Sequence, residues 1–221
     1  MPDFVHLHNH THYSLLDGAC TVDGLVNAAV ENNMKAVALT DHGVLFGLME
    51  FYKKAKQAGV KPILGCELYV ARSSRFDRGG ESNGTGKKLK NYSHLIILAK
   101  NQTGYKNLIK LSTLGHTEGF YYKPRVDIDA LREHREGLVA LSACAGGVVA
   151  SPLINDGYDA GKEVARDFKD IFGDDFYLEL QNHHIDREQI VLEGLPRIAK
   201  ELGVKVICTN DCHYVKQNQA I

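Results

Sequence analysis

The sequence lacks the features of membrane, secreted and disulfide-rich proteins. It has no tryptophan, and no apolar run approaches the roughly 20 residues that a helix needs to cross a membrane. Charge and histidine follow the first residues directly, without the apolar core of a secretory signal peptide. The cysteines are odd in number and form no paired framework: Cys20, Cys66, Cys144, Cys208 and Cys212. We therefore expect a cytoplasmic protein with reduced thiols and no membrane partner.

A large excess of charge of one sign is also absent. The 26 Lys and Arg residues nearly balance the 27 Asp and Glu residues, and the formal net charge of −1 argues against binding nucleic acid by bulk electrostatics. A local basic patch is still compatible with this balance. The 221 residues, 44% of them hydrophobic, suffice for a real core, and we expect one domain over residues 1–221.

Histidine, in contrast, is abundant, with eleven residues, four of which alternate in His6, His8, His10 and His12. In an extended chain alternate side chains project to the same side, so these imidazoles can approach one metal ion. Zinc, manganese and iron all suit such ligands. The alternative is a polar strand edge that binds nothing. Metal binding needs partners from elsewhere in the chain.

Strand-like and helix-like segments alternate along the sequence. The predicted strands cover residues 4–8, 35–40, 60–64 with a companion at 67–70, 93–99, 138–142, 176–181 and 204–209. The predicted helices cover residues 21–32, 45–58, 103–114, 130–134, 160–172 and 187–202. About seven strands alternating with helices are typical of a parallel sheet. We expect an α/β barrel, closed or nearly closed, with a doubly wound open sheet as the alternative.

Residues able to bind metal recur where the predicted strands end. In strand order they are His8 and His10, Asp41 and His42, Glu67, Cys144, His183 and His184, and Asp211 and His213. His94 is an exception, because it begins its strand. Any one of them alone is more often a cap or a packed side chain, but together they predict a site at one rim of a barrel. Glu67 could bridge two ions about 3.5–4 Å apart, the arrangement that displaces phosphate esters.

Some short motifs are more specific than this pattern. Those that carry possible ligands are His8-Asn9-His10-Thr11, Thr40-Asp41-His42, Gly65-Cys66-Glu67, His94, Cys144 and Asp211-Cys212-His213. Others are Tyr13-Ser14-Leu15-Leu16-Asp17-Gly18, Gly43-Val44-Leu45-Phe46-Gly47 and Glu118-Gly119-Phe120-Tyr121-Tyr122-Lys123-Pro124-Arg125. Over essentially the whole chain, these motifs resemble the polymerase-and-histidinol-phosphatase (PHP) family, and most closely the PHP domains of bacterial replicative DNA polymerases.

The resemblance implies a fold and a set of ligands. The fold is a distorted seven-stranded (β/α)7 barrel with up to three divalent metal ions, zinc, manganese or iron, at its rim. Carried over position by position, the metal ligands are His8, His10, Asp17, His42, Glu67, His94, Cys144, Asp211 and His213. Asp17 and Cys144 stand where free-standing phosphatases of the family have histidine, which favours the polymerase branch.

The resemblance also implies a function. It suggests a metal-dependent phosphoesterase that acts on the 3′ end of DNA as a proofreading 3′→5′ exonuclease, with Asp17 and Asp211 as candidate catalytic residues. Its partners would be the rest of a longer polymerase chain and replisome subunits, and we expect the polymerase active site to lie outside these 221 residues. Two alternatives remain open: a structural module that stabilises the polymerase and docks a proofreading subunit, and a free-standing small-molecule phosphatase.

Substrate contacts are a separate expectation. Residues 72–91 are rich in Gly, Ser, Asn and basic residues and predict a long exposed loop. Its basic side chains could guide DNA by phosphate contacts or could be solvated without a ligand: Arg72, Arg75, Arg78, Lys87, Lys88 and Lys90. Arg72 and His183 are the candidates to touch the substrate phosphate.

Overall fold

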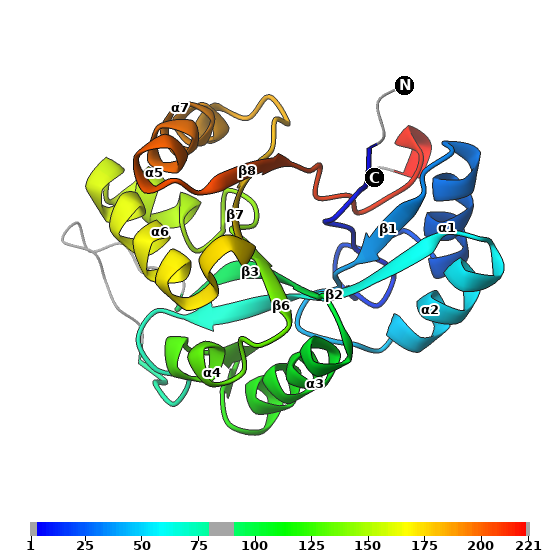
Figure 1. Ribbon diagram of the computed structural model, residues 1–221, viewed down its shortest axis with the longest axis horizontal. Helices are drawn as coiled ribbons and strands as arrows, with labels where there is room; N and C mark the ends of the chain where they lie inside the picture. Colours follow the sequence, from blue (N-terminus) through cyan, green and yellow to red (C-terminus); the bar gives the residue numbers. More distant parts are fainter. Residues whose placement is uncertain (1–3, 80–90, 220–221) are drawn as a thin grey trace.

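The computed structural model of the protein describes residues 4–79 and 91–219. A curled sheet lies at its centre and helices surround it (Figure 1). Around the barrel the strands are β1 (Ala36–Leu39), β2 (Lys61–Ala71), β3 (Tyr92–Ala99), β6 (Leu138–Leu141), β7 (Phe176–Leu180) and β8 (Lys205–Cys208). A short antiparallel hairpin, β4 (Phe120–Tyr121) and β5 (Lys123–Val126), extends the sheet beside the C-terminal end of β2.

The N-terminal segment closes the barrel. On one side, the amides of Ala38 and Thr40 donate to the carbonyls of His6 and Asn9, at 2.9 and 3.0 Å. On the other side, the His10 amide donates to the Cys212 carbonyl, at 2.8 Å. Residues 4–8 therefore form an extended segment between β1 and the end of β8 rather than the regular strand that the sequence predicted. With the six strands around the barrel, this segment completes the predicted distorted seven-stranded barrel.

The helices cover the outside of the sheet (Figure 1). They are α1 (Val22–Glu31), α2 (Leu48–Gln57), α3 (Gln102–Thr117), α4 (Ile128–Glu133), α5 (Ala150–Asn155), α6 (Tyr158–Phe172) and α7 (Asp186–Leu202), with short 3-10 turns η1 (Gly173–Asp175) and η2 (Gln217–Gln219). Helix α1 shows why they form: the Thr21 hydroxyl accepts from the Gly24 amide, and Leu25 and Ala29 recur at helical spacing on a buried face. Within the described ranges, no helix has both the length and the apolar character of a membrane span.

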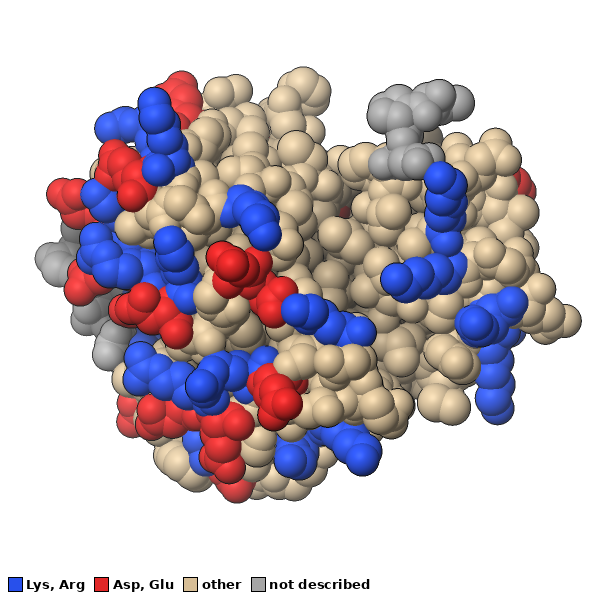
Figure 2. Space-filling view, viewed as in Figure 1, with Lys and Arg blue, Asp and Glu red and all other residues tan. Residues whose placement is uncertain are grey.

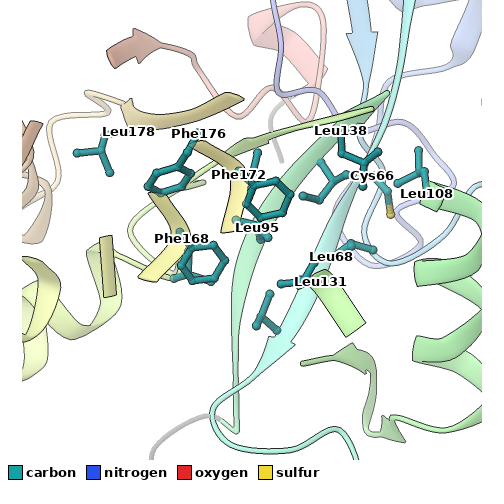
Figure 3. Close-up of a cluster of buried hydrophobic side chains, with 14 of the residues drawn as sticks. Cys66, Leu68, Leu95, Leu108, Leu131, Leu138, Phe168, Phe172, Phe176 and Leu178 are labelled. Carbon is teal, nitrogen blue, oxygen red and sulfur yellow. The ribbon is translucent and has the colours of Figure 1, made fainter. Parts of the chain in front are cut away.

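Two apolar layers hold the barrel together. Figure 3 shows the outer layer, in which Leu68 and Leu95 of the sheet pack in one cluster with Phe168 and Phe172 of α6. A smaller inner layer fills the barrel and consists of Ala38, Ile96, Leu98, Leu141 and Ala143. Because side chains alternate along a strand, neighbours in sequence separate into these layers. This alternation turns Glu67 and His94 toward the inside of the barrel.

The structure corrects two expectations about the strands. The predicted strand at 60–64 and its companion at 67–70 are one continuous strand, β2, so Glu67 lies within a strand and not after one. The sheet is not wholly parallel, because β3 runs antiparallel to both β2 and β6. The reversed direction also explains the exceptional position of His94: the first residues of β3 lie at the rim where the parallel strands end.

Candidate metal centre

One rim of the barrel collects the residues predicted to bind metal. His8 and His10 come from the closing segment, Asp17 from the loop before α1, and His42 from the turn after β1. Glu67 and His94 come from β2 and β3, Cys144 follows β6, and Asp211 and His213 follow β8. His8, His10 and Glu67 are fully buried. The remaining six residues line a cleft of about 520 Å³ above them: Asp17, His42, His94, Cys144, Asp211 and His213.

The deepest group is formed by His8, His10, Glu67 and Asp211, whose ligand atoms lie within 4.8 Å of one another. His8 Nε2 is 2.8 Å from Glu67 Oε2 and 3.0 Å from Asp211 Oδ1, and the His10 and His8 Nε2 atoms are 3.1 Å apart. Asp211 Oδ1 is buried and, among the described residues, has no partner in hydrogen-bonding geometry. Two imidazole nitrogens and two carboxylate oxygens converging in this way fit a divalent cation such as zinc, manganese or iron.

A second group lies nearer the cleft and contains His10, His42 and His213, again with ligand atoms within 4.8 Å. The His10 ring stacks on the other two, with centroids 4.0 and 4.4 Å away. Asp17 Oδ2 is 3.4 Å from His42 Nε2 and 3.8 Å from His213 Nε2, so this carboxylate lies beside the group. Because His10 Nδ1 faces the Ser14 hydroxyl at 3.1 Å, its Nε2 can serve only one ion, and His42, His213 and Asp17 offer the further ligands for a second divalent cation.

Glu67 connects the deep group to the other ligands. Its Oε2 faces the deep group, whereas its Oε1 is 2.9 Å from His42 Nδ1 and 2.7 Å from His94 Nδ1. Cys144 Sγ lies 3.8 Å from the same His94 nitrogen. His94 and Cys144 thus form a third edge of the centre, and Glu67 is placed to bridge ions on its two sides.

Glu179 of β7 is a functional residue that the sequence analysis missed. It accepts a hydrogen bond from His8 Nδ1 at 2.7 Å and from the Ala143 amide at 3.1 Å, and the Thr209 hydroxyl and Gln181 amide also donate to it. When Glu179 keeps the proton on Nδ1, the neutral His8 ring directs its Nε2 lone pair into the deep group. Carboxylates commonly orient metal-binding histidines in this way. The signal was a carboxylate within the otherwise uncharged and largely apolar strand β7.

Asp41 holds the loop that carries Asp17. The sequence placed it among the candidates at strand ends, but its carboxylate accepts from the Thr11 amide and hydroxyl and from the Ser14 hydroxyl, at 2.6, 2.8 and 2.8 Å. Both of its oxygens are therefore engaged in shaping the turn at residues 11–14. Asp41 supports the centre and does not face the converging ligand atoms.

The charges in the centre depend on one another. Burial lowers the pKa of His8, but the carboxylates of Glu179 and Asp211 outweigh this and hold the pKa well above its ordinary value. Burial likewise opposes the effect of Glu67 on His94, whose pKa is raised to about 10. Burial raises the pKa values of the Glu67 and Asp211 carboxyls. The neighbouring imidazoles lower these pKa values by more, so both lie well below their usual range. A bound divalent ion can replace these protons as the balancing charge.

Two non-glycine residues at the centre have left-handed backbone conformations. They are Asp211, with φ of 47°, and Ala143, with φ of 62°, directly before Cys144. Such conformations are uncommon outside glycine and collect at functional sites, where the surrounding structure maintains them.

The predicted substrate contacts lie away from the cleft. Arg72 lines a separate cavity beside Asn91 and Arg125, and Arg75 is paired with Glu118 and Asp127, at 2.7 and 2.8 Å. The structure therefore does not bring these arginines together with the ligands. Lys87, Lys88 and Lys90 lie outside the described residues.

His183 is also occupied by contacts of its own. Its Nδ1 is 2.8 Å from Glu188 Oε1 and its Nε2 is 2.9 Å from the carbonyl of Asn210. It is exposed next to the segment that carries Asp211, where it can position that segment. His184 is exposed as well and lies outside both ligand groups.

Comparison with known proteins places this centre in a family. The sequence matches the PHP domain family over residues 6–183. The DNA polymerase III subunit alpha of Borreliella burgdorferi is 47% identical over 217 residues, which are 98% of this chain and 18% of that protein. This chain thus spans less than a fifth of the length of that relative.

Solved structures show the same fold at low sequence identity. An amidohydrolase from Chromobacterium violaceum superposes with a TM-score of 0.61 at 16% identity, covering 95% of this chain and 87% of the other. A two-domain protein from Bacteroides vulgatus, containing a predicted PHP-like metal-dependent phosphoesterase, gives 0.57 at 15% identity, covering 97% of this chain and 53% of the other. With the family match over residues 6–183, these findings show that the chain belongs to the PHP domain family.

Proposed function

We propose that this protein is a metal-dependent phosphoesterase that removes nucleotides from the 3′ end of a DNA strand. The observation that carries the proposal is the position of Glu67. One of its oxygens lies 2.8 Å from His8 Nε2, and the other lies within 2.9 Å of ring nitrogens of His42 and His94. A carboxylate that faces two ligand groups can bridge two metal ions, as in enzymes that displace phosphate esters.

The residues of the chain would hold and orient the reacting groups. Ions bound there would polarise a phosphoryl oxygen, activate a water and stabilise the leaving oxygen. Asp17 and Asp211 would supply negative charge that retains the ions, and burial of His8, His10 and Glu67 would keep the ligand atoms fixed. The cleft above them is lined by Asp17, whose side chain is half exposed, so a phosphodiester can reach the centre from solvent. No side chain is needed as a covalent nucleophile.

DNA as the substrate is supported by the relatives. The similar Borreliella protein is named as a DNA polymerase subunit, and removal of a mispaired 3′ nucleotide is chemistry that such a protein can use.

The charge distribution on the surface favours local contacts with DNA over bulk electrostatic attraction. On the face in Figure 2, basic and acidic side chains are interspersed over the half that carries α4 to α7, while mostly basic ones lie over α1 and α2.

The test is cleavage of a single-stranded oligonucleotide and of a duplex with a mismatched 3′ end, with manganese, zinc or chelator added. We expect metal-dependent release of 3′ nucleotides by the parent and none by Asp17→Asn or Asp211→Asn. These changes preserve shape but remove the charge that holds a metal. Asp170→Asn, an exposed aspartate on α6, is the matched control and should behave as the parent. A metal-loaded parent that cleaves neither substrate would contradict the proposal and favour the structural module.

A further inference from the structure

The cleft above the metal ligands has an apolar edge. Leu15, Leu16 and Phe46 line it, yet they are 83%, 89% and 67% exposed. We call these three residues the apolar rim. Large apolar side chains that are exposed together beside a charged centre indicate a binding surface, because a ligand that packs on them removes apolar surface from water. A phosphate group alone has no apolar surface that could pack against these side chains.

A lysine lies in the same cleft. Among the residues that the structure describes, no carboxylate is within ion-pair distance of the Lys123 ammonium, which lies 5.2 Å from the centre of the Tyr69 ring. That ring is 6.2 Å from the His42 ring and 5.4 Å from the His94 ring, between centroids. Lys123 is therefore a cation without a carboxylate partner that is separated from the metal ligands by one aromatic ring. It is free to contact an anion.

The hairpin that carries Lys123 is fixed in place. Arg125, which is only 1% exposed, donates to the carbonyls of Gly119, Arg75 and Asp77 behind it. Gly43, directly after His42, has a φ of +66°, and a Cβ at this position would come within 2.8 Å of Pro124 Cγ. The hairpin thus packs tightly against the turn of a metal ligand. The Lys123 backbone is held at a set position relative to the centre, which reduces the ordering that binding would require.

We propose that Lys123 and the apolar rim form a binding site for an unpaired nucleic-acid end, an inference that rests on the proposed function. Lys123 contacts a backbone phosphate next to the one that is cleaved, and an unpaired base stacks on Phe46 and packs against the leucines. A single strand alternates anionic phosphates with flat apolar bases, which is the combination that the cleft presents. In a duplex the faces of the bases are already stacked and cannot use the rim.

The binding test uses a fluorescent single-stranded thymidine oligonucleotide whose 3′ phosphorothioate linkages resist cleavage, followed by anisotropy. We expect Phe46→Ala to weaken binding about tenfold, as for loss of one stacking partner. Lys123→Gln should lower the magnitude of the slope of log affinity against log salt by about 0.7, the value for one phosphate contact on a single strand. The matched controls are Ile190→Ala and Lys106→Gln, both exposed and outside the cleft.

Turnover of bis(p-nitrophenyl) phosphate separates this inference from the proposed function. The small diester has neither a second phosphate nor a nucleobase, so its turnover by the parent reports on the centre, and the controls Ile190→Ala and Lys106→Gln should leave its kcat/KM unchanged. A parent that binds this oligonucleotide but turns over neither the small diester nor an unmodified oligonucleotide would contradict the proposed function and still support the binding site. Variants that bind as tightly as the parent would overturn the site, as would a parent that does not bind. If rim variants instead change the oligomeric state at unchanged oligonucleotide affinity, the rim is a protein contact and the proposal is wrong.

Discussion

Glu179 determines how His8 faces the centre, although it belongs to neither ligand group. It is 1% exposed and accepts from His8 Nδ1 and from the Ala143 amide, which joins β7 to the turn before Cys144. In the neutral ring that a metal would bind, the bond to Nδ1 selects the His8 tautomer whose Nε2 lone pair points into the deep group, between Glu67 and Asp211. The ligands alone do not account for this orientation.

Glu179→Gln should therefore weaken metal binding while the fold is kept. The amide retains one acceptor, but its NH₂ group is placed against donors that the carboxylate satisfied. We expect the affinity for the tightest metal to fall about 10–100-fold, as for other partners behind metal-binding histidines. The measurement is a titration against a competing chelator, with Glu201→Gln, which is paired with Lys162 away from the centre, as control. Equal affinities for parent and Glu179→Gln would show that His8 orients without this partner.

Metal binding should strengthen as the pH rises. Without metal, the carboxylates hold the pKa values of His8 and His10 above their ordinary value, and that of His94 at about 10. His94 therefore carries its proton at neutral pH, the protonated forms of His8 and His10 are favoured, and a metal has to displace these protons. Raising the pH removes the competing protons, so apparent affinity should increase from pH 6.5 up to the range of the His94 pKa.

Calorimetry in buffers of different ionisation enthalpy measures the proton release directly. We expect more than one proton to be released for each protein molecule saturated with metal at pH 7, because several imidazoles have raised pKa values. A pH-independent affinity without proton release would mean that the histidines are already neutral in the metal-free protein.

At the scale of the elements, periodicity predicted most segments but not their pairing. Helices at 160–172 and 187–202 agree closely with α6 and α7. The break placed inside β2 came from Gly65, which usually marks a turn or a bulge in a strand. In the structure this glycine lets the neighbouring strand approach, since a Cβ would lie 2.6 Å from Leu98 Cδ2 and 2.7 Å from the Ile97 carbonyl. Such a contact joins distant parts of the chain and leaves no local signal.

For the candidate site too, the residues within local motifs were predicted, whereas contacts between distant parts of the chain were not. The sequence motifs named all four residues of the deep group, and the structure brings them within 4.8 Å. The reversed direction of β3, which delivers His94 to the rim, and the supporting role of Glu179 depend on which strands are neighbours. The charge of Arg75 suggested a DNA contact, but its pairing with Asp127 was not visible from sequence spacing. Local chemistry was predictable, and partners distant in the chain were not.

The hairpin Phe120–Val126 depends on one buried side chain. Arg125→Ala would leave the carbonyls of Arg75 and Asp77 without the guanidinium donor and open a cavity, while the Gly119 carbonyl would keep only the bond from the backbone amide of residue 125. We expect the free energy of unfolding to fall by about 3 kcal/mol, because unsatisfied buried polar groups cost about 1–3 kcal/mol each and partly rehydrate. Urea unfolding measures the loss, and Arg166→Ala, an exposed position on α6, is the control. A loss below about 0.5 kcal/mol, typical of surface positions, would show that the hairpin does not need this anchor.

For the molecule as a whole, the centre lies where the barrel closes. The deep group takes His8 and His10 from the N-terminal segment, Glu67 from β2 and Asp211 from the segment after β8. Any ion held by these residues joins the two ends of the described chain to the middle of the sheet. Metal binding and closure of the barrel should therefore be coupled, and bound metal should stabilise the folded state by mass action.

The central claim is that the residues at this rim hold divalent metal. Elemental analysis of the purified protein after dialysis against metal-free buffer, beside Asp211→Asn with an unchanged circular dichroism spectrum, tests it most directly. We predict more than one ion for each parent molecule, because Glu67 faces two ligand groups, and at least one ion fewer in the variant. A parent that retains no metal after incubation with zinc, manganese or iron would contradict the claim, and so would a variant with the same metal content as the parent.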